Sequence, residues 1–225
     1  MSARAEILGA IRAKRDGGEA ATDDVRAACR ARIAAQARNK TPARSALEAD
    51  AMVDLFEAMA VKADARVDRI ESIDRLPDAV AEILAAENLP AMLAAAPDPA
   101  LQAAPWDRRA MLSLAWGPSD GSHAAALTRA DCGAAETGTL ILFSGPERPT
   151  TLNFLPDLHF VVIRKADIVR HYEDGWDLLR ARYGAGAAPR TVNMITGPSR
   201  SADIEQTLQL GAHGPRTLRI LLVDA

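Results

Sequence analysis

The spacing of hydrophobic residues changes along the chain, from a helical pattern at the start to short apolar runs further on. Ile7, Leu8 and Ile11 form an apolar stripe among basic residues. A Gly17-Gly18 break follows, and then Thr22 or Asp23 caps a second helix that runs to about residue 39. A third helix starts near Thr41-Pro42. Three successive helices before any strand predict an N-terminal helical extension over residues 1–64.

From residue 65 onward, apolar runs alternate with helical segments, which predicts an α/β domain over residues 65–225. The order indicates an open, mostly parallel sheet flanked by helices. Such sheets bind ligands beyond the carboxyl ends of their strands, so the turn after Thr196 and the loop at 130–138 are both candidates for that edge. The predicted strands cover 66–70, 90–95, 110–115, 124–129, 139–143, 159–164, 191–196 and 218–223, with helices at 73–87 and 166–183.

The composition narrows the class of protein. The chain has 225 residues and a net charge of -3, which argues against nucleic acid as the main partner because phosphate backbones require a basic surface. No apolar stretch approaches the ~20 residues of a membrane span, and the first residues lack the apolar core of a secretion signal. Two cysteines, Cys29 and Cys132, fit reduced thiols. We therefore expect a cytoplasmic protein.

The segment from Ile195 to Pro215 carries the most informative pattern. An apolar run breaks at Gly197-Pro198, and a polar segment with helical character begins at Ser199. A strand, a tight turn and a helix start direct free backbone N–H groups at an anion, and Arg200 can grip a carboxylate or phosphate. The alternative is a turn that only changes direction and caps the helix.

Other residues of this segment complete the predicted ligand site. Ser201 follows Arg200 in the segment, and Asp203 and Glu205 sit in the first helical turns, where one of them is a candidate general base or a partner that holds Arg200. A second turn contains His213 and Gly214. His213 is a candidate hydrogen-bond donor or proton carrier.

A second segment, Ala126 to Ile163, places Glu136, Thr137 and Gly138 between two apolar strands. A carboxylate on a glycine-containing loop beside a buried strand suits a general base or an acyl-forming nucleophile, and the alternatives are a solvated turn acid or a helix cap. Cys132 and His159 are interpreted as buried core residues. The four histidines show no metal-ligand spacing, so no metal site is predicted, and neither a P-loop nor a dinucleotide-binding fingerprint occurs.

Together the two segments resemble the LUD-domain family of lactate utilization proteins, and most closely its short subunit, LutC. The resemblance covers roughly residues 124–224. It departs from the family at Arg129, Ala134 and Arg219. The matching residues are Ala130-Asp131, Glu136-Thr137-Gly138-Thr139-Leu140, Leu155-Pro156, His159, the run from Thr196 to Glu205, and Gly211, His213, Gly214 and Pro215.

The resemblance implies a NagB/RpiA/CoA-transferase-like α/β fold and a role in oxidising L-lactate to pyruvate beside iron–sulfur partner subunits. The partners, and not this chain, would carry the clusters. Two function classes stay open. The chain is either a subunit of that system, binding a small carboxylate or phosphate or serving assembly, or a stand-alone CoA-transferase-like or sugar-phosphate-type enzyme that uses Glu136.

Overall fold

The computed structural model describes residues 2–16, 22–184, 186–204 and 207–224, which form two compact units, Met1–Lys40 and Thr41–Ala225. The first unit contains α1 (Ala3–Asp16) and α2 (Asp23–Ala35). The Thr22 hydroxyl accepts a hydrogen bond from the Val25 N–H and caps α2, and no residue of α2 is buried. The two helices predicted in this region are confirmed, although the second ends four residues earlier than expected. Among the described residues, no helix is long and apolar enough to cross a bilayer.

The second unit is built on a six-stranded sheet in which every pair of neighbouring strands is parallel. Its order is β1-β12-β7-β4-β2-β3, so the first and last strands of the unit pair at one edge. This sheet confirms the α/β class that the alternating pattern predicted. The strands are β1 (Arg66–Ile70), β2 (Met92–Ala95), β3 (Ser113–Trp116), β4 (Ala125–Arg129), β7 (Leu158–Arg164) and β12 (Thr217–Val223).

A second sheet of four strands, in the order β8-β5-β6-β9, packs beside the first. Its strands are β5 (Cys132–Ala134), β6 (Thr139–Phe143), β8 (Ile168–Val169) and β9 (Val192–Ile195). The sequence predicted β6 and β9 as separate strands but not β5 or β8. These two are only three and two residues long, too short to show a periodic pattern.

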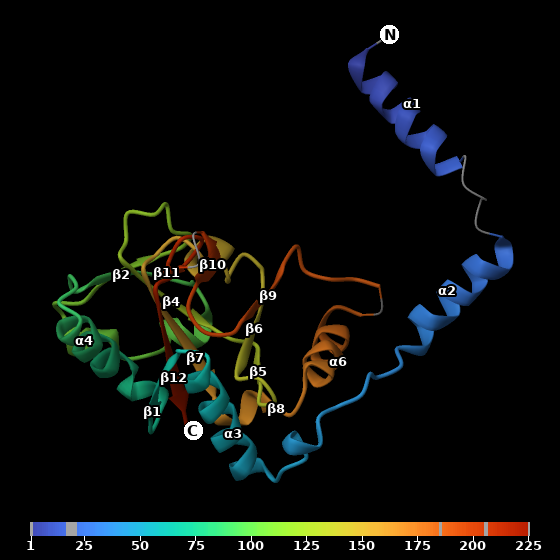
Figure 1. Ribbon diagram of the computed structural model, residues 1–225. Helices are drawn as coiled ribbons and strands as arrows, with labels where there is room; N and C mark the ends of the chain where they lie inside the picture. Colours follow the sequence, from blue (N-terminus) through green and yellow to red (C-terminus); the bar gives the residue numbers. More distant parts are fainter. Residues whose placement is uncertain (1, 17–21, 185, 205–206, 225) are drawn as a thin grey trace. The chain divides into compact units, whose positions relative to one another are not determined.

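The helices of the second unit cover its sheets in layers (Figure 1). The helix α4 (Leu76–Ala86) packs on one face of the parallel sheet, and α3 (Ala49–Lys62) packs on the other with the small sheet. The helix α6 (Tyr172–Tyr183) covers the far side of the small sheet. Shorter elements are η1 (Ala43–Ser45), η2 (Ile73–Arg75), α5 (Pro99–Gln102), η3 (Trp106–Arg109), η4 (Thr150–Asn153) and η5 (Lys165–Asp167).

The third helix of the predicted extension, α3, lies within the second unit. Its Val53, Phe56 and Ala60 are buried in the core against strands of both sheets. The two compact units divide after Lys40. A domain boundary at residue 64 therefore stays a prediction.

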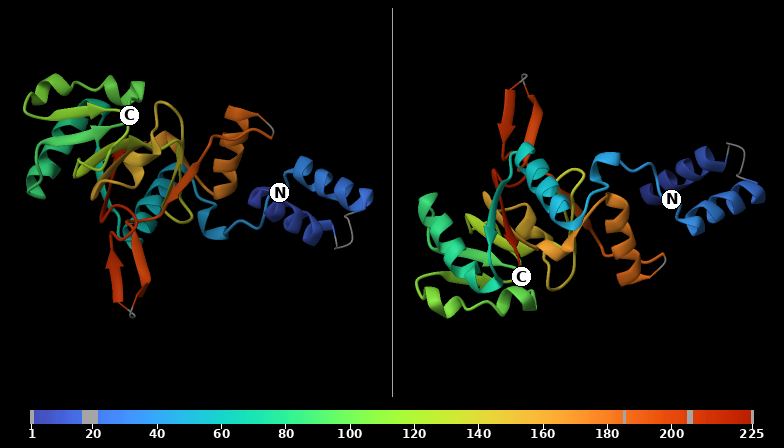
Figure 2. Two further views of the ribbon diagram at one scale, coloured as in Figure 1. Left: turned by 90° about the horizontal axis from the view of Figure 1, so that it is seen from above. Right: turned by 90° about the horizontal axis from the view of Figure 1, so that it is seen from below.

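The polar segment after Ser199 is a β-hairpin, so the helix predicted there is wrong. The hairpin consists of β10 (Arg200–Ile204) and β11 (Thr207–Leu210), paired antiparallel. The order Thr-Leu-Gln-Leu in β11 alternates polar and apolar residues with the period of a strand. Figure 2 shows the two strands projecting from the rest of the α/β unit.

The carboxyl-terminal end of α3 touches two glycine-containing turns. Gly138 has a φ of +67°, and a Cβ added to it would lie 2.2 Å from the Ala60 backbone nitrogen. Gly197 has a φ of +76°, and its added Cβ would lie 1.9 Å from the Ala63 carbonyl oxygen. Both conformations disfavour other residues, and the close backbone leaves no room for a side chain. The two turns therefore pack tightly against the carboxyl-terminal end of α3.

A buried ion network lies at the carboxyl ends of β2 and β4. Asp98, 1% exposed, pairs with the guanidinium groups of Arg129 and Arg148 at 3.0 Å each. Arg148 also pairs with buried Asp131 at 2.8 Å, and Asp131 contacts Arg182. Burial alone would raise the pKa of Asp98, but the charge of Arg129, the Ala100 N–H and the charge of Arg148 together hold it below its usual value.

Gly138→Ala is expected to lower the free energy of unfolding by about 2–4 kcal/mol, because the methyl group meets the α3 backbone and the residue keeps a left-handed conformation. Chemical denaturation followed by circular dichroism measures this. Gly145→Ala is the matched control, since nothing lies within 4 Å of its added Cβ. Equal stabilities of the two variants would contradict the close approach.

Asp98→Asn is expected to cost about 3–5 kcal/mol at pH 7, because two arginines lose a buried carboxylate. The folded pKa of Asp98 is depressed, so its contribution is complete above the ordinary pKa of ~4 and is lost as pH falls through the lower folded value. The difference from wild type should therefore shrink below about pH 4. Asp50→Asn, at an exposed pair with Lys165, is the control and should change little. A deficit that stays constant down to acid pH would refute the linkage.

Candidate functional site

A cavity of about 220 Å³ opens where the two turns of the C-terminal segment meet the parallel sheet. The turn after β9 forms one wall, the turn before β12 forms another, and the first residues of β7 and β12 lie below. The lining residues are Asn153, Phe154, His159, Met194, Ile195, Thr196, Gly197, Pro198, Ser199, His213, Gly214, Pro215 and Leu218. Four of these, Gly197, Ser199, His213 and Gly214, are site residues predicted from the sequence.

The backbone joins the two turns directly. The Ser199 N–H donates to the Pro215 carbonyl at 2.8 Å, and the Gly211 N–H donates to the Ser199 carbonyl at 2.9 Å. Gly214 packs against Ser199, with its added Cβ only 3.3 Å from the Ser199 Cβ. The two turns that the sequence singled out therefore lie side by side and line one cavity, although neither leads into a helix.

His159 is the most deeply buried polar residue at the cavity. It is fully buried on β7, its Nε2 lies 2.7 Å from the Thr128 hydroxyl, and its Nδ1 has no partner. Burial lowers the pKa of His159 to about 3, so the ring is neutral near pH 7. Thr128 has no other hydrogen-bond partner among the described residues, so we assign its hydroxyl as the donor to Nε2. The Nδ1–H is then an unused donor.

Asn153 supplies an unused acceptor at the same cavity. It is the last residue of η4, is 5% exposed, and its Oδ1 is buried without a hydrogen-bond partner. Buried polar groups without partners are uncommon and destabilising. A cavity with one unused donor and one unused acceptor suits a ligand group that accepts and donates at once.

The rest of the cavity is apolar or uncharged. Phe154 and Met194, both partly exposed, and buried Pro215 contribute apolar surface. The Ser199 hydroxyl has no partner among the described residues, and the same holds for the backbone N–H groups of Gly197 and Gly214. Exposed His213 is the only ionisable side chain besides His159 among the described lining residues. These groups can hold a small anion through hydrogen bonds.

The cavity lies at the amino ends of β7 and β12 and at the carboxyl end of β9, whose Met194 and Ile195 line it. His159 and Leu218 are the second residues of β7 and β12. The ion network of Asp98 and Asp131 lies at the carboxyl ends of β2 and β4, the edge at which an α/β sheet usually binds its ligand. The turn after Thr196, a candidate named from the sequence, lines the cavity from the carboxyl end of β9, whereas the parallel sheet contributes the amino ends of β7 and β12.

Arg200, the predicted anion ligand, binds the end of α3 instead. Its Nη1 lies 2.7 Å from an Asp64 carboxylate oxygen, and its Nη2 donates to the Ala63 carbonyl at 3.2 Å. This contact caps the carboxyl-terminal end of the helix, where a positive charge is favourable. Arg200 does not line the cavity. A role in ligand binding stays a prediction, and the structure gives this side chain a structural one.

The remaining residues of the predicted C-terminal site lie on the hairpin or beyond the described part. Ser201 is half-buried on β10 and pairs with Gln209 in register. Asp203 is also on β10, but its side chain lies outside the described residues, as does all of Glu205.

Glu136 lies at the amino-terminal end of α6 and has structural partners. It is 7% exposed, and its carboxylate accepts a hydrogen bond from the Tyr172 N–H at 2.9 Å. Its other oxygen is 3.5 Å from His171 Nδ1, and its carbonyl accepts from Arg44. This is the helix-cap alternative considered from the sequence. Thr137 and Gly138 also lie outside the cavity, and the catalytic role of Glu136 stays a prediction.

Ser45, His171 and Glu136 are close together but do not form a catalytic triad. The Ser45 hydroxyl lies 3.0 Å from His171 Nδ1, the same nitrogen that faces Glu136. A triad needs the serine and the acid on different ring nitrogens. Ser45 is also fully buried. The cluster fastens the segment before α3 to the start of α6.

Cys132 is an inert core thiol. It lies on β5 and is 1% exposed. Burial, together with the charge of Asp131, raises the pKa of this thiol to about 12. The interpretation of Cys132 as a buried structural residue is consistent with this environment. No group of three or more metal-binding side chains occurs among the described residues.

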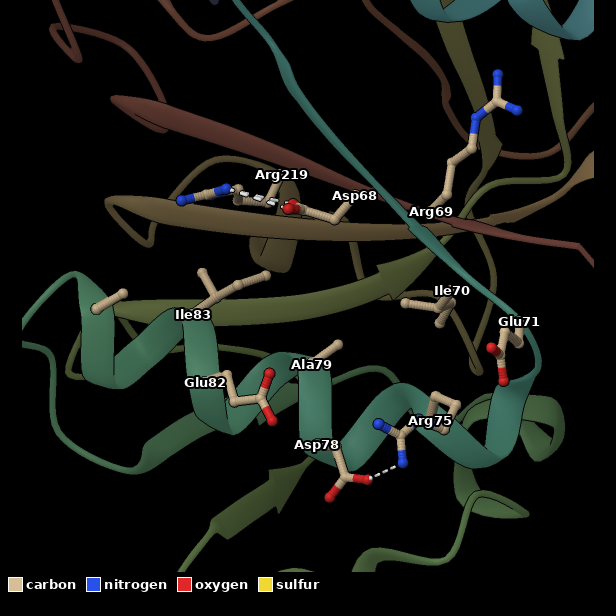
Figure 3. A pocket seen from close by; sticks show the side chains of 11 residues that line it. Asp68, Arg69, Ile70, Glu71, Arg75, Asp78, Ala79, Glu82, Ile83 and Arg219 are labelled. Atoms are coloured by element: carbon tan, nitrogen blue, oxygen red, sulfur yellow. Dashed lines mark hydrogen bonds and ion pairs between the residues drawn. The ribbon is translucent and has the colours of Figure 1, made fainter.

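A larger hollow of about 540 Å³ lies between β1 and α4, outside the predicted site (Figure 3). Its walls carry paired charges, with Arg219 beside Asp68 and Arg75 beside Asp78. Ile70 and Ala79 lie between these pairs. Because its charges largely neutralise one another, we assign no ligand to this hollow.

Comparison with known proteins matches residues 121–223 to the LUD domain. A Neisseria meningitidis protein named Uncharacterized protein NMB1437 is 40% identical over 99 residues, which are 44% of this chain and 42% of that protein. Lactate utilization protein C of Bacillus subtilis is 36% identical over 99 residues, 44% of this chain and 41% of that protein. A protein of the same name from Geobacillus sp. strain WCH70 is 38% identical over 98 residues, 43% and 41% of the two chains.

The fold has a counterpart among solved structures. The crystal structure of a DUF162 family protein from Deinococcus radiodurans matches with a TM-score of 0.58 and 25% identity, over 79% of this chain and 99% of that one. The chain spans about two fifths of the length of the curated relatives it matches. The matched region includes the cavity, its two turns and the loop of Glu136. Residues 121–223 of this chain therefore match the LUD domain, and over that region the chain is similar to proteins named lactate utilization protein C.

Proposed function

We propose that this chain is a component of a lactate utilization system and that its cavity binds a small 2-hydroxy carboxylate, with L-lactate as the first candidate. Several similar proteins are named lactate utilization protein C, which supports the first part. The second part is carried by one observation, the unpartnered Nδ1 of His159 and the unpartnered Oδ1 of Asn153 on residues that line one cavity.

The three groups of a 2-hydroxy acid match the three kinds of surface in the cavity. An alcohol accepts from the His159 Nδ1–H and donates to the Asn153 Oδ1, which satisfies both. A carboxylate accepts hydrogen bonds from the Ser199 hydroxyl and from nearby backbone N–H groups. A methyl group packs on apolar residues such as Phe154. At about 220 Å³ the cavity is below the roughly 300–1,000 Å³ of sites for drug-sized ligands, which favours a small molecule.

Oxidation of the bound hydroxy acid is assigned to partners in this proposal. The family resemblance implies iron–sulfur subunits as those partners, and an iron–sulfur cluster takes four thiolates where this chain has two cysteines. His159 is neutral at physiological pH and holds the hydroxyl rather than removing its proton. The role of this chain is then to bind the substrate or product carboxylate within the system.

Asn153→Leu is expected to weaken L-lactate binding about 10-fold or more, because the bound hydroxyl loses its acceptor in a buried site. The same variant should keep or gain stability, since it removes an unsatisfied buried oxygen. Isothermal titration calorimetry and thermal unfolding measure the two effects. Propionate, which lacks the hydroxyl, should bind wild type more weakly than L-lactate and should bind both proteins alike.

Asn193→Leu is the matched control for that experiment. Asn193 is also buried with an unpartnered amide atom, but it does not line the cavity, so lactate affinity should be unchanged. Equal affinity of wild type for L-lactate and propionate would contradict the assigned hydroxyl site, as would undiminished lactate binding in Asn153→Leu.

In the native host, removal of this chain is expected to abolish or strongly slow growth on L-lactate as the carbon source while growth on pyruvate continues. Wild-type protein should restore growth, and Asn153→Leu should not, although it is present at wild-type level. Normal growth on L-lactate without the chain would contradict the role in lactate utilization.

A further inference from the structure

A separate cavity of about 680 Å³ lies beside the ends of β6 and β9. Two arginines, Arg148 and Arg190, and three hydroxyl residues, Ser144, Thr150 and Thr191, line it. No acidic residue is among its described lining residues. It has no lining residue in common with the cavity of His159. The two cavities are therefore independent candidate sites.

Both charged side chains among the described lining residues are arginines. In the ion network, three guanidinium groups, those of Arg129, Arg148 and Arg182, face two carboxylates, those of Asp98 and Asp131. Arg190 is exposed and has no ion pair among the described residues. One guanidinium of the network and that of Arg190 thus remain uncompensated. A low-dielectric network with surplus positive charge attracts an anion.

Arg148 is held rigidly at the cavity. Its side chain is 10% exposed, and its two terminal nitrogens are fixed by Asp131 and Asp98 at 2.8 and 3.0 Å. Its Nε is buried without a hydrogen-bond partner. A guanidinium that is already oriented loses little conformational entropy when a ligand binds.

We propose that this cavity binds the phosphoryl group of a small phosphorylated molecule or free phosphate. A tetrahedral oxyanion has acceptor oxygens in several directions, and the lining offers it the hydroxyls of Thr150 and Thr191 and the charges of Arg148 and Arg190. A carboxylate has only two oxygens in one plane and cannot use donors on all sides. This site does not depend on the proposed role in lactate utilization.

The test is isothermal titration of the full chain with inorganic phosphate, glycerol 2-phosphate and acetate at constant ionic strength. Phosphate and the monoester should both bind, and acetate should bind at least ~10-fold more weakly. Arg190→Gln should weaken phosphate binding ~10-fold or more, because a charged hydrogen-bond donor is lost, without changing L-lactate binding. Tighter binding of the monoester than of phosphate identifies a phosphorylated metabolite, and the reverse identifies free phosphate.

Arg180→Gln is the matched control. Arg180 is a partly exposed arginine paired with Asp177 on α6, and its replacement should leave phosphate binding unchanged. Thr150→Val keeps the side-chain shape and should weaken phosphate binding several-fold by removing one hydroxyl. Equal phosphate affinities of wild type, Arg190→Gln and Thr150→Val would overturn the site, as would the absence of phosphate binding to wild type at low ionic strength.

Discussion

The close approach of α3 to Gly138 and Gly197 sets the arrangement of the whole second unit. Each glycine lets a turn lie directly on the backbone at the end of the helix. Arg200 then fastens the second turn by binding Asp64 and the Ala63 carbonyl. Where the turns meet, the Thr139 and Thr196 hydroxyls lie 2.6 Å apart beside the paired strands β6 and β9. The glycines and Arg200 of the C-terminal and Glu136 segments therefore serve in large part to pack these segments on α3.

This packing also places the candidate ligand site. With Gly197 held on α3, the Ser199 turn reaches the Pro215 carbonyl and forms the wall of a cavity above β7 and β12. The scaffold leaves a histidine nitrogen and an asparagine oxygen buried there without partners. Unlike the unpartnered atoms of Asn193 and Arg219, these two belong to residues that line one cavity, where a ligand can supply the missing hydrogen bonds. The unpaired Asn153 oxygen therefore lowers the stability of the folded chain and, in the proposed site, supplies the hydrogen-bond acceptor for the ligand.

The sequence predicted the elements with strong periodicity and the location of the C-terminal turns, but not the roles of their side chains. Strands such as β6 and β7 were found from their apolar runs, and Ser199, His213 and Gly214 do line one cavity. Arg200 looked like an anion ligand because its partner, Asp64, is 136 residues away in the chain.

His159 and Asn153 were not predicted as site residues, because contacts between distant parts of the chain decide which of their atoms stay unpaired. Each lies in a segment that reads as ordinary core or loop, and their importance arises from hydrogen bonds that they lack after folding. Sequence patterns report which residues are buried but not which buried groups remain unpaired. The inclusion of His159 in the family motif was the one signal that could have drawn attention to it.

The most direct test of the central claim is a long-range ¹H–¹⁵N NMR spectrum of the protein labelled at its histidines, recorded during titration with L-lactate. The account predicts that His159 is a neutral Nδ1–H tautomer near pH 7 and that its Nδ1–H signal shifts until lactate saturates the site. A His159 protonated at Nε2, or an Nδ1–H signal that does not move when lactate binds, would contradict the account.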